Sequence, residues 1–137
     1  MATLSIQITT PNRTVIDAKN IVMVSAQGVE GDFAVLPNHI PFVTKINPGI
    51  VRIRSNEGNI QTVAVGPGFF QVADNTVIVL TDEAILPEEA DKRRAEEVRE
   101  KAQALLQEKL EGTDFQKVEA ELRRSLLELK LIEHTER

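Results

Sequence analysis

One boundary constrains the fold of this chain more than any other feature: near residue 87, a turn-rich, alternating pattern gives way to a densely charged one. Residues 1–86 hold five of the six prolines and six of the seven glycines. Residues 87–137 hold eleven of the sixteen basic residues and fourteen of the twenty-one acidic ones. Such a shift marks a change of architecture. We therefore predict two domains, residues 1–86 and residues 87–137.

The first domain has the pattern of short β-strands. Residues 3–9 alternate polar and apolar side chains, as in a half-buried strand. Residues 14–17 and 21–24 are predicted to form two further short strands, and later apolar segments flank polar turns in the manner of hairpins. About eight to ten strands at this spacing predict an antiparallel β-sandwich or flattened barrel.

The second domain has the pattern of two helices. Pro87 suits a first helical turn, and acidic residues follow it. Gly112 is predicted to end the first helix, and Thr113 begins a capping-box spacing for the second. Apolar residues recur at spacings of three and four, which predicts one buried stripe on each helix: Ala95, Val98, Ala102 and Leu105 on the first, and Phe115, Val118, Leu122, Leu126, Leu129 and Ile132 on the second.

A short link between two helices favours an antiparallel hairpin. The fold class is therefore α+β, an N-terminal antiparallel β-sandwich followed by a C-terminal two-helix hairpin. Alanine buries little apolar area, so the hairpin gains only modestly from its first stripe. We expect it to be able to open and to pack elsewhere.

Composition excludes several functions. The chain has no cysteine, a formal net charge of −5 and 4% aromatic residues. Disulfides and thiolate chemistry are thus excluded, and nucleic acid is not an expected partner because phosphate binding needs a basic face. No apolar stretch approaches the roughly 20 residues of a membrane span, so no direct membrane insertion is expected. The start of the sequence lacks the features of a signal peptide, which predicts a cytoplasmic or organelle-interior protein.

Catalytic motifs are missing as well. The two histidines, His39 and His134, belong to no cluster with metal-ligand spacing. The Gly66-Pro67-Gly68 segment lacks the spacing and the lysine of a phosphate-binding loop. We therefore expect a non-enzymatic binding or assembly protein, with no metal and no required cofactor.

The segment at residues 28–42, GVEGDFAVLPNHIPF, resembles a signature of the epsilon subunits of F-type ATP synthases. It combines an acidic turn, a short apolar strand and the pattern Leu-Pro-x-His-x-Pro. TPNRTV at residues 10–15, PGIVRI at 48–53, GFFQV at 68–72 and the charged hairpin stand in the family's order. The resemblance covers essentially the whole chain. It departs at residues 66–68, where a Gly-Gly pair is common.

The resemblance implies a non-catalytic subunit of the central stalk that binds the gamma subunit and the ring of c subunits. Asp32 matches the acidic turn that faces the c ring, and His39 matches a residue on the gamma side. On its own, a loop histidine more often caps backbone groups. The location implied is peripheral, on the cytoplasmic face of the plasma membrane or the stromal face of a thylakoid.

In the family the hairpin folds down or extends toward the alpha and beta subunits, and the extended form inhibits ATP hydrolysis. Basic side chains of the hairpin are then candidates to meet acidic loops on beta: Arg93, Arg94, Arg99, Arg123 and Arg124. As bare charges, such residues are more often simply solvated.

Some bacterial relatives bind ATP through a hairpin motif that residues 90–95 match except at the first position. Arg94 would then hold a phosphate oxygen, Asp91 would accept from the adenine amine or cap the helix, and Arg124 would be a second phosphate partner. Glu128 stands where binders tend to have another arginine, and its charge opposes phosphate. We therefore predict only weak, regulatory ATP binding.

An alternative from another class is a free-standing β-sandwich ligand-binding module that dimerises through its helical tail. It predicts a stable homodimer and no affinity for a gamma subunit.

Overall fold

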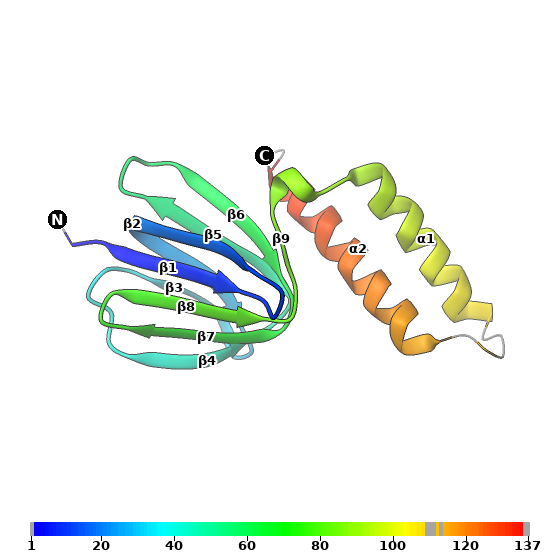
Figure 1. Cartoon of the computed structure of the whole chain (residues 1–137), viewed down its shortest axis with the longest axis horizontal. Helices are drawn as coiled ribbons and strands as arrows, with labels where there is room; N and C mark the ends of the chain where they lie inside the picture. The colour runs from blue at the N-terminus through cyan, green and yellow to red at the C-terminus, as the bar shows by residue number, and fades with distance from the viewer. Residues whose placement is uncertain (1, 109–111, 113, 136–137) are drawn as a thin grey trace. The chain divides into compact units, whose positions relative to one another are not determined.

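A computed structural model describes residues 2–108, 112 and 114–135 of the chain. These residues form nine strands, a short 3-10 helix and two α-helices, which confirms the predicted α+β fold class (Figure 1). The chain divides into two compact units, Met1–Leu86 and Pro87–Arg137. The strands are β1 (Leu4–Thr9), β2 (Thr14–Gly28), β3 (Gly31–Val35), β4 (Phe42–Ile46), β5 (Gly49–Ser55), β6 (Ile60–Val65), β7 (Gly68–Ala73), β8 (Thr76–Thr81) and β9 (Ala84–Ile85).

The strands form one sheet that folds back on itself. Its order is β1-β8-β7-β4-β2-β5-β6-β9, and β3 pairs with β2. β1 pairs with both β8 and β2, and this double pairing joins the two ends of the chain's first unit in one sheet. The pairing of β1 with β8 is parallel, from Ser5 opposite Thr76 to Thr9 opposite Leu80, whereas the other pairs of the described strands are antiparallel.

β2 is one long strand where two short strands were predicted. Asn20 has a φ of 61° in its middle, and the pairing with β5 shifts register between Ile21 and Met23. Such an irregularity bends a strand without ending it, and a sequence pattern shows it as a break. β4 and β9 were not predicted. The burial of β4 alternates, but its sequence does not, because the apolar Val43 is exposed and the polar Thr44 is half-buried, and β9 has two residues.

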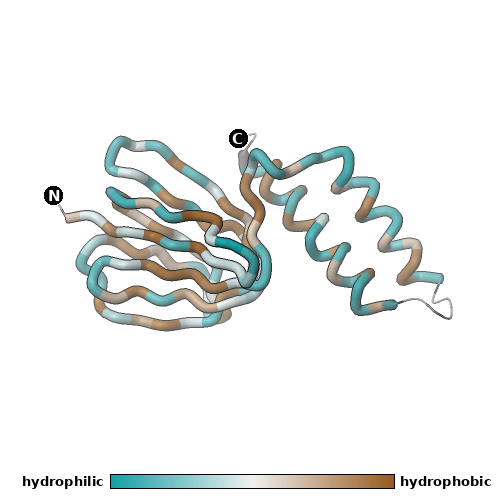
Figure 2. Tube along the Cα trace, viewed as in Figure 1, coloured by the Kyte–Doolittle hydropathy of each residue, from teal (hydrophilic) through white to brown (hydrophobic). Residues whose placement is uncertain are grey.

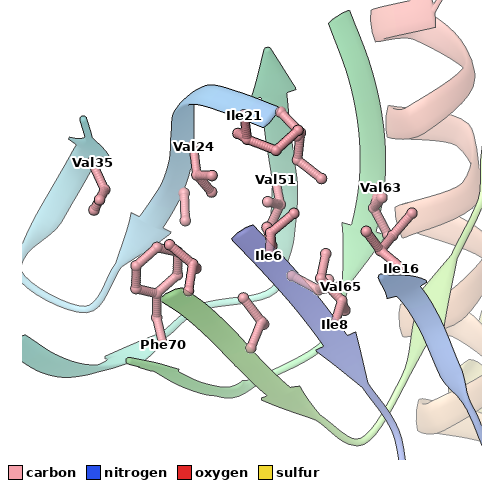
Figure 3. Close-up of a cluster of buried hydrophobic side chains, with 14 of the residues drawn as sticks. Ile6, Ile8, Ile16, Ile21, Val24, Val35, Val51, Val63, Val65 and Phe70 are labelled. Carbon is pink, nitrogen blue, oxygen red and sulfur yellow. The ribbon is translucent and has the colours of Figure 1, made fainter. Parts of the chain in front are cut away.

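The core lies inside the folded sheet and takes side chains from all nine described strands. In β1, Leu4, Ile6 and Ile8 are buried and alternate with half-buried polar residues, as the period of two predicts. Figure 3 shows apolar side chains of β1, β2, β3, β5, β6 and β7 pointing into this core. The largest is Phe70, which is fully buried and packs edge-on against Phe33 at a centroid distance of 4.8 Å.

The turn at residues 66–68 lies where neighbouring backbone segments approach each other closely. Gly66 N donates to Glu83 O at 2.8 Å. A side chain at Gly68 would collide with the backbone oxygen of Leu80 on β8. A glycine is therefore required there, and the proline between the two glycines is compatible with the turn.

The second unit begins with a short 3-10 helix, η1 (Pro87–Glu89), and its first α-helix is α1 (Lys92–Glu108). Pro87 therefore does not begin α1, because Asp91 is the N-cap: its Oδ1 accepts from Arg94 N at 3.1 Å. The second helix is α2 (Phe115–Thr135), and Asp114 caps it by accepting from Lys117 N at 3.1 Å. Thr113, the predicted start of a capping box, lies outside the described residues. Gly112 has a φ of 83°, the left-handed conformation that favours glycine after a helix.

α1 presents its predicted stripe, with Ala95 and Ala102 buried. The prediction for α2 was partly wrong, because Phe115 and Leu126 are 38% and 46% exposed. Four other residues of α2 are buried in addition to the predicted Val118: Ser125, Leu127, Glu128 and Leu131. Figure 2 shows hydrophilic and hydrophobic residues interspersed along both helices. Apolar spacing alone did not reveal that two polar side chains are buried.

Candidate functional site

His39, a predicted partner residue, lies in the loop between β3 and β4. Asn38 N donates to Asn75 Oδ1 at 2.6 Å, and Asn75 Nδ2 donates back to Asn38 Oδ1 at 3.2 Å. Asn75 belongs to the tight turn between β7 and β8. Both asparagines have positive φ, 68° and 59°, which asparagine tolerates better than most residues. The two hydrogen bonds fix the His39 loop to a neighbouring turn, a link that no local sequence signal indicated.

The His39 ring is half-buried and has a defined orientation. Its Nδ1 lies 2.7 Å from the backbone oxygen of Ile40, and since a carbonyl only accepts, Nδ1 carries the proton. The ring centroid lies 5.9 Å from that of Phe42. The backbone interaction expected of a loop histidine therefore forms, and it uses Nδ1. Next to it, Ile40 is 74% exposed.

Asp32 lies at the start of β3 and pairs with Gln27 in the register with β2. Its side chain is exposed beside the turn at residues 29–30. Gly31 precedes it with a φ of 129°. One residue on, Phe33 anchors the strand through edge contacts with Phe42 and Phe70. Asp32 is therefore an exposed carboxylate on a well-anchored strand.

An exposed apolar surface, which the sequence reasoning missed, lies on the outer face of β4, β7 and β8. Val43, Phe69 and Leu80 are 64%, 49% and 52% exposed, and we call these three residues the outer patch. Phe69 lies opposite Leu80 on one side and Lys45 on the other, so the three strands are consecutive neighbours. The available signal was the Phe69-Phe70 pair, because neighbouring residues of a strand point to opposite faces. Because β4 was not predicted, the sequence did not show that Val43 lies beside Phe69 on the same outer surface.

The remaining predicted partner residues lie on the hairpin. Arg93 is a surface residue of α1 whose Nε donates to Glu97 Oε1 at 3.4 Å, one helical turn on. Arg99 is half-buried on the same helix, and Arg123 is exposed on α2. These three arginines are thus divided between the two helices, Arg93 and Arg99 on α1 and Arg123 on α2.

The predicted nucleotide residues are brought together in part. Arg94 of α1 and Arg124 of α2 both approach Glu128 Oε1, at 3.9 Å and 3.3 Å. All three residues line a cavity of about 460 Å³ between the two helices. Asp91 is not among the lining residues, and its Oδ1 caps α1. ATP binding stays a prediction, and the geometry adds that Glu128 lies between the two arginines that were expected to hold phosphate.

Comparison with known proteins identifies the family of this chain. The sequence model of the ATP synthase delta/epsilon chain β-sandwich domain matches residues 3–87. The ATP synthase epsilon chain of Moorella thermoacetica is 39% identical over 130 residues, which is 95% of this chain and 96% of that one. The chain belongs to the ATP synthase epsilon chain family. The epsilon chain of Bacillus subtilis is also 39% identical, over 84% of this chain and 86% of its own length. The resemblance inferred from the motifs is thus confirmed.

Solved structures support the fold of this epsilon-family chain. A chain of the Euglena gracilis mitochondrial ATP synthase, in a structure of OSCP, F1 and the c ring, matches with a TM-score of 0.68 and 22% identity. That match covers 99% of this chain and 81% of the Euglena chain. A chain of the central stalk and c ring from Tetrahymena thermophila matches with a TM-score of 0.54 and 15% identity, over 64% of this chain and 69% of that one. At these identities the likeness is one of fold.

Among the described residues, no helix combines the length and the apolar character needed to cross a membrane.

Proposed function

We propose that this chain is a non-catalytic central-stalk subunit of an F-type ATP synthase. It connects the gamma subunit to the c ring, and its hairpin restrains ATP hydrolysis. Membership of the epsilon chain family favours this role over a free-standing ligand-binding module. The location that follows is peripheral, on the cytoplasmic face of the plasma membrane or, in a plastid, on the stromal face of the thylakoid.

The observation that carries the proposed gamma contact is the outer patch. Three large apolar side chains on neighbouring strands stay exposed although the same strands bury Phe70, Val72 and Val79 on their other face. Clustered exposed apolar residues are typical of protein interaction sites. The His39 loop, with exposed Ile40, is held to the β7–β8 turn by two hydrogen bonds, so it forms a second rigid element of the sandwich surface. Preformed surfaces bind with a smaller loss of conformational entropy.

A binding experiment with purified gamma subunit tests this contact. Phe69→Asp places a charge in the outer patch and leaves the core side of β7 unchanged, so gamma affinity should fall at least about tenfold. Ile60→Asp is the matched control, because Ile60 is a 57% exposed apolar residue outside the outer patch. His39→Glu should also weaken assembly more than folding. Equal losses for Phe69→Asp and Ile60→Asp would remove the outer patch from the proposed interface.

The proposed contact with the c ring uses Asp32. Its carboxylate is exposed on a strand that Phe33 anchors, so Asp32→Lys should reverse the local charge without changing the fold. Reconstituted enzyme should then show weaker coupling between hydrolysis and ion transport. An unchanged coupling ratio would argue against Asp32 as a c-ring contact.

The proposed inhibition depends on a hairpin that can leave its closed form. The α1 side of its interface is built on Ala95 and Ala102, which bury little apolar area. Another surface can therefore compete for the helices, and the basic residues Arg93, Arg99 and Arg123 would face acidic loops of the beta subunit in the extended form. Deleting residues 88–137 should raise ATP hydrolysis by the assembled enzyme and leave assembly intact. If the deletion leaves ATP hydrolysis unchanged under every nucleotide condition tested, the hairpin is structural and not regulatory.

A further inference from the structure

A buried carboxylate joins the two helices of the hairpin. Glu128 of α2 is only 4% exposed. Its Oε1 lies 3.3 Å from Nε of Arg124, one turn earlier on the same helix, and 3.9 Å from Nη2 of Arg94 on α1. Glutamate is rarely buried to this extent unless it is paired. Here the pairing groups come from both helices, so a single oxygen atom links α1 to α2 through charge.

The other oxygen of the same carboxylate has no such partner. Glu128 Oε2 is buried and makes no hydrogen bond within the described residues. A buried, unbonded oxygen is unfavourable, since it has lost its water. An apolar residue of similar size would avoid this loss. The position therefore needs a reason other than packing, and the two guanidinium groups supply one.

The cavity beside Glu128 is lined by more cationic than anionic side chains. These are three cationic side chains and two carboxylates: Arg94, Lys101, Arg124, Glu121 and Glu128. Apolar side chains of α1 and Ser125 of α2 complete the lining. Without the charge of Glu128, three cations would face one carboxylate in a cavity of about 460 Å³. Guanidinium groups bind phosphate and carboxylate groups with similar geometry.

We propose that Glu128 is an internal anion that occupies this site and closes the hairpin without a bound ligand. A phosphate-bearing ligand then competes with the chain's own carboxylate for Arg94 and Arg124. The closed hairpin is therefore the default form of the isolated chain. It becomes dependent on an added anion only when the charge of Glu128 is removed.

Fluorescence energy transfer on the full chain tests this proposal. The sequence has no cysteine, so Gln103→Cys on α1 and Leu126→Cys on α2 give two unique labelling positions, both exposed and neither lining the cavity. The probe is inorganic pyrophosphate, titrated at constant ionic strength with sodium chloride as the reference salt. Transfer efficiency reports the ratio of open to closed hairpin in each variant.

The background with native Glu128 should be closed and should not respond to pyrophosphate. Glu128→Gln keeps the size of the side chain and removes its charge, so the ratio of open to closed hairpin should rise about tenfold, equal to about 1.4 kcal/mol. Pyrophosphate should then close this variant, because a ligand of the closed form stabilises it by mass action. Glu119→Gln, an exposed glutamate of α2, is the matched control and should behave as the native background does.

Two outcomes would overturn the proposal. One is a Glu128→Gln hairpin as closed as the native background in the absence of pyrophosphate. The other is a native hairpin that pyrophosphate closes as strongly as it closes the variant, which would mean that the carboxylate does not occupy the site. If Glu128→Gln fails to fold, Arg94→Gln replaces it, since the Arg94 side chain is 59% exposed. That variant should open the hairpin and show no closure by pyrophosphate, and a hairpin that stays closed would contradict the proposal equally.

Discussion

The sandwich and the hairpin are stabilised by different kinds of interaction. The sandwich buries apolar side chains from all nine of its described strands, and Ile8, Phe70 and Val79 are fully inaccessible. The hairpin unit also buries apolar side chains, namely Ala95 and Ala102 on α1 and Val118, Leu127 and Leu131 on α2, but it adds a buried glutamate, Glu128, that contacts arginines of both helices. Apolar burial is non-directional and requires only shape, whereas charge pairs can be exchanged for other charges. The proposed exchange of partners by the hairpin therefore rests on its charge pairs, which the apolar core of the sandwich does not have.

Removing the hairpin is the strongest test of this difference. A fragment that ends at Leu86 should lose the helical circular dichroism signal and keep a cooperative thermal transition of β type, since the apolar core cluster lies within residues 4–84. Far-ultraviolet circular dichroism and calorimetry measure both. An insoluble fragment, or one that melts without cooperativity, would show that the sandwich depends on the helices.

Two adjacent phenylalanines of β7 test the sandwich core. Phe70→Ala should lower the free energy of unfolding by about 3–5 kcal/mol, because it removes a fully buried ring. Phe69→Ala, on the opposite face and 49% exposed, should change it by less than about 1 kcal/mol. Urea denaturation measures both variants. Similar losses in the two would mean that the outer patch is part of the core and not a free surface.

Two alanines of α1 make the corresponding test of the hairpin. Ala102 is buried and also lines the cavity between the helices, so the larger side chain of Ala102→Leu must either enter that cavity or push the helices apart, and hairpin stability should change by about 1–3 kcal/mol. Ala104→Leu, at an exposed position on the same helix, is the control and should have little effect. The helical signal during thermal unfolding reports the difference. If both variants melt as the native chain does, α1 and α2 do not pack through the Ala95–Ala102 face.

Much of the fold could be predicted from the sequence, because the signals are local. Alternation in residues 3–9 predicted the buried face of β1, and the alanine spacing predicted the stripe of α1. The sequence of β4 has no polar–apolar alternation, so the strand could not be predicted locally, and it pairs with β7 across about 25 residues of sequence. The parallel pairing of β1 with β8 is also a long-range property, and no local pattern encodes it.

The candidate site was predictable to a smaller extent. Motif resemblance selected Asp32, His39, Arg94 and Arg124, but it could not show which of them meet in space. The burial of Glu128 had no apolar signal, because the helix period was traced through leucines such as Leu126, which the structure leaves 46% exposed. The outer patch depends on β4, β7 and β8 lying side by side, and adjacency of strands is not visible in any single segment.

The smallest expected effect on stability comes from Arg93, a hairpin residue for which we propose a contact with the beta subunit. The Arg93 side chain is 91% exposed and pairs with Glu97, itself 67% exposed, at 3.4 Å. Exposed pairs at this spacing contribute at most about 0.5 kcal/mol, and salt screens them further. Arg93→Gln should therefore lower the thermal transition of the helices by no more than about 2–4 °C. In the assembled enzyme the same change should relieve part of the inhibition of hydrolysis, because a guanidinium that contributes little to the folded chain remains free to contribute to a contact with beta.

Glu97→Gln is the control: it breaks the same pair but retains the arginine, so inhibition should persist. A clear drop in hairpin stability with Arg93→Gln would assign the residue a structural role, and equal relief of inhibition by both variants would show that the pair, and not the arginine, sets the hairpin's activity.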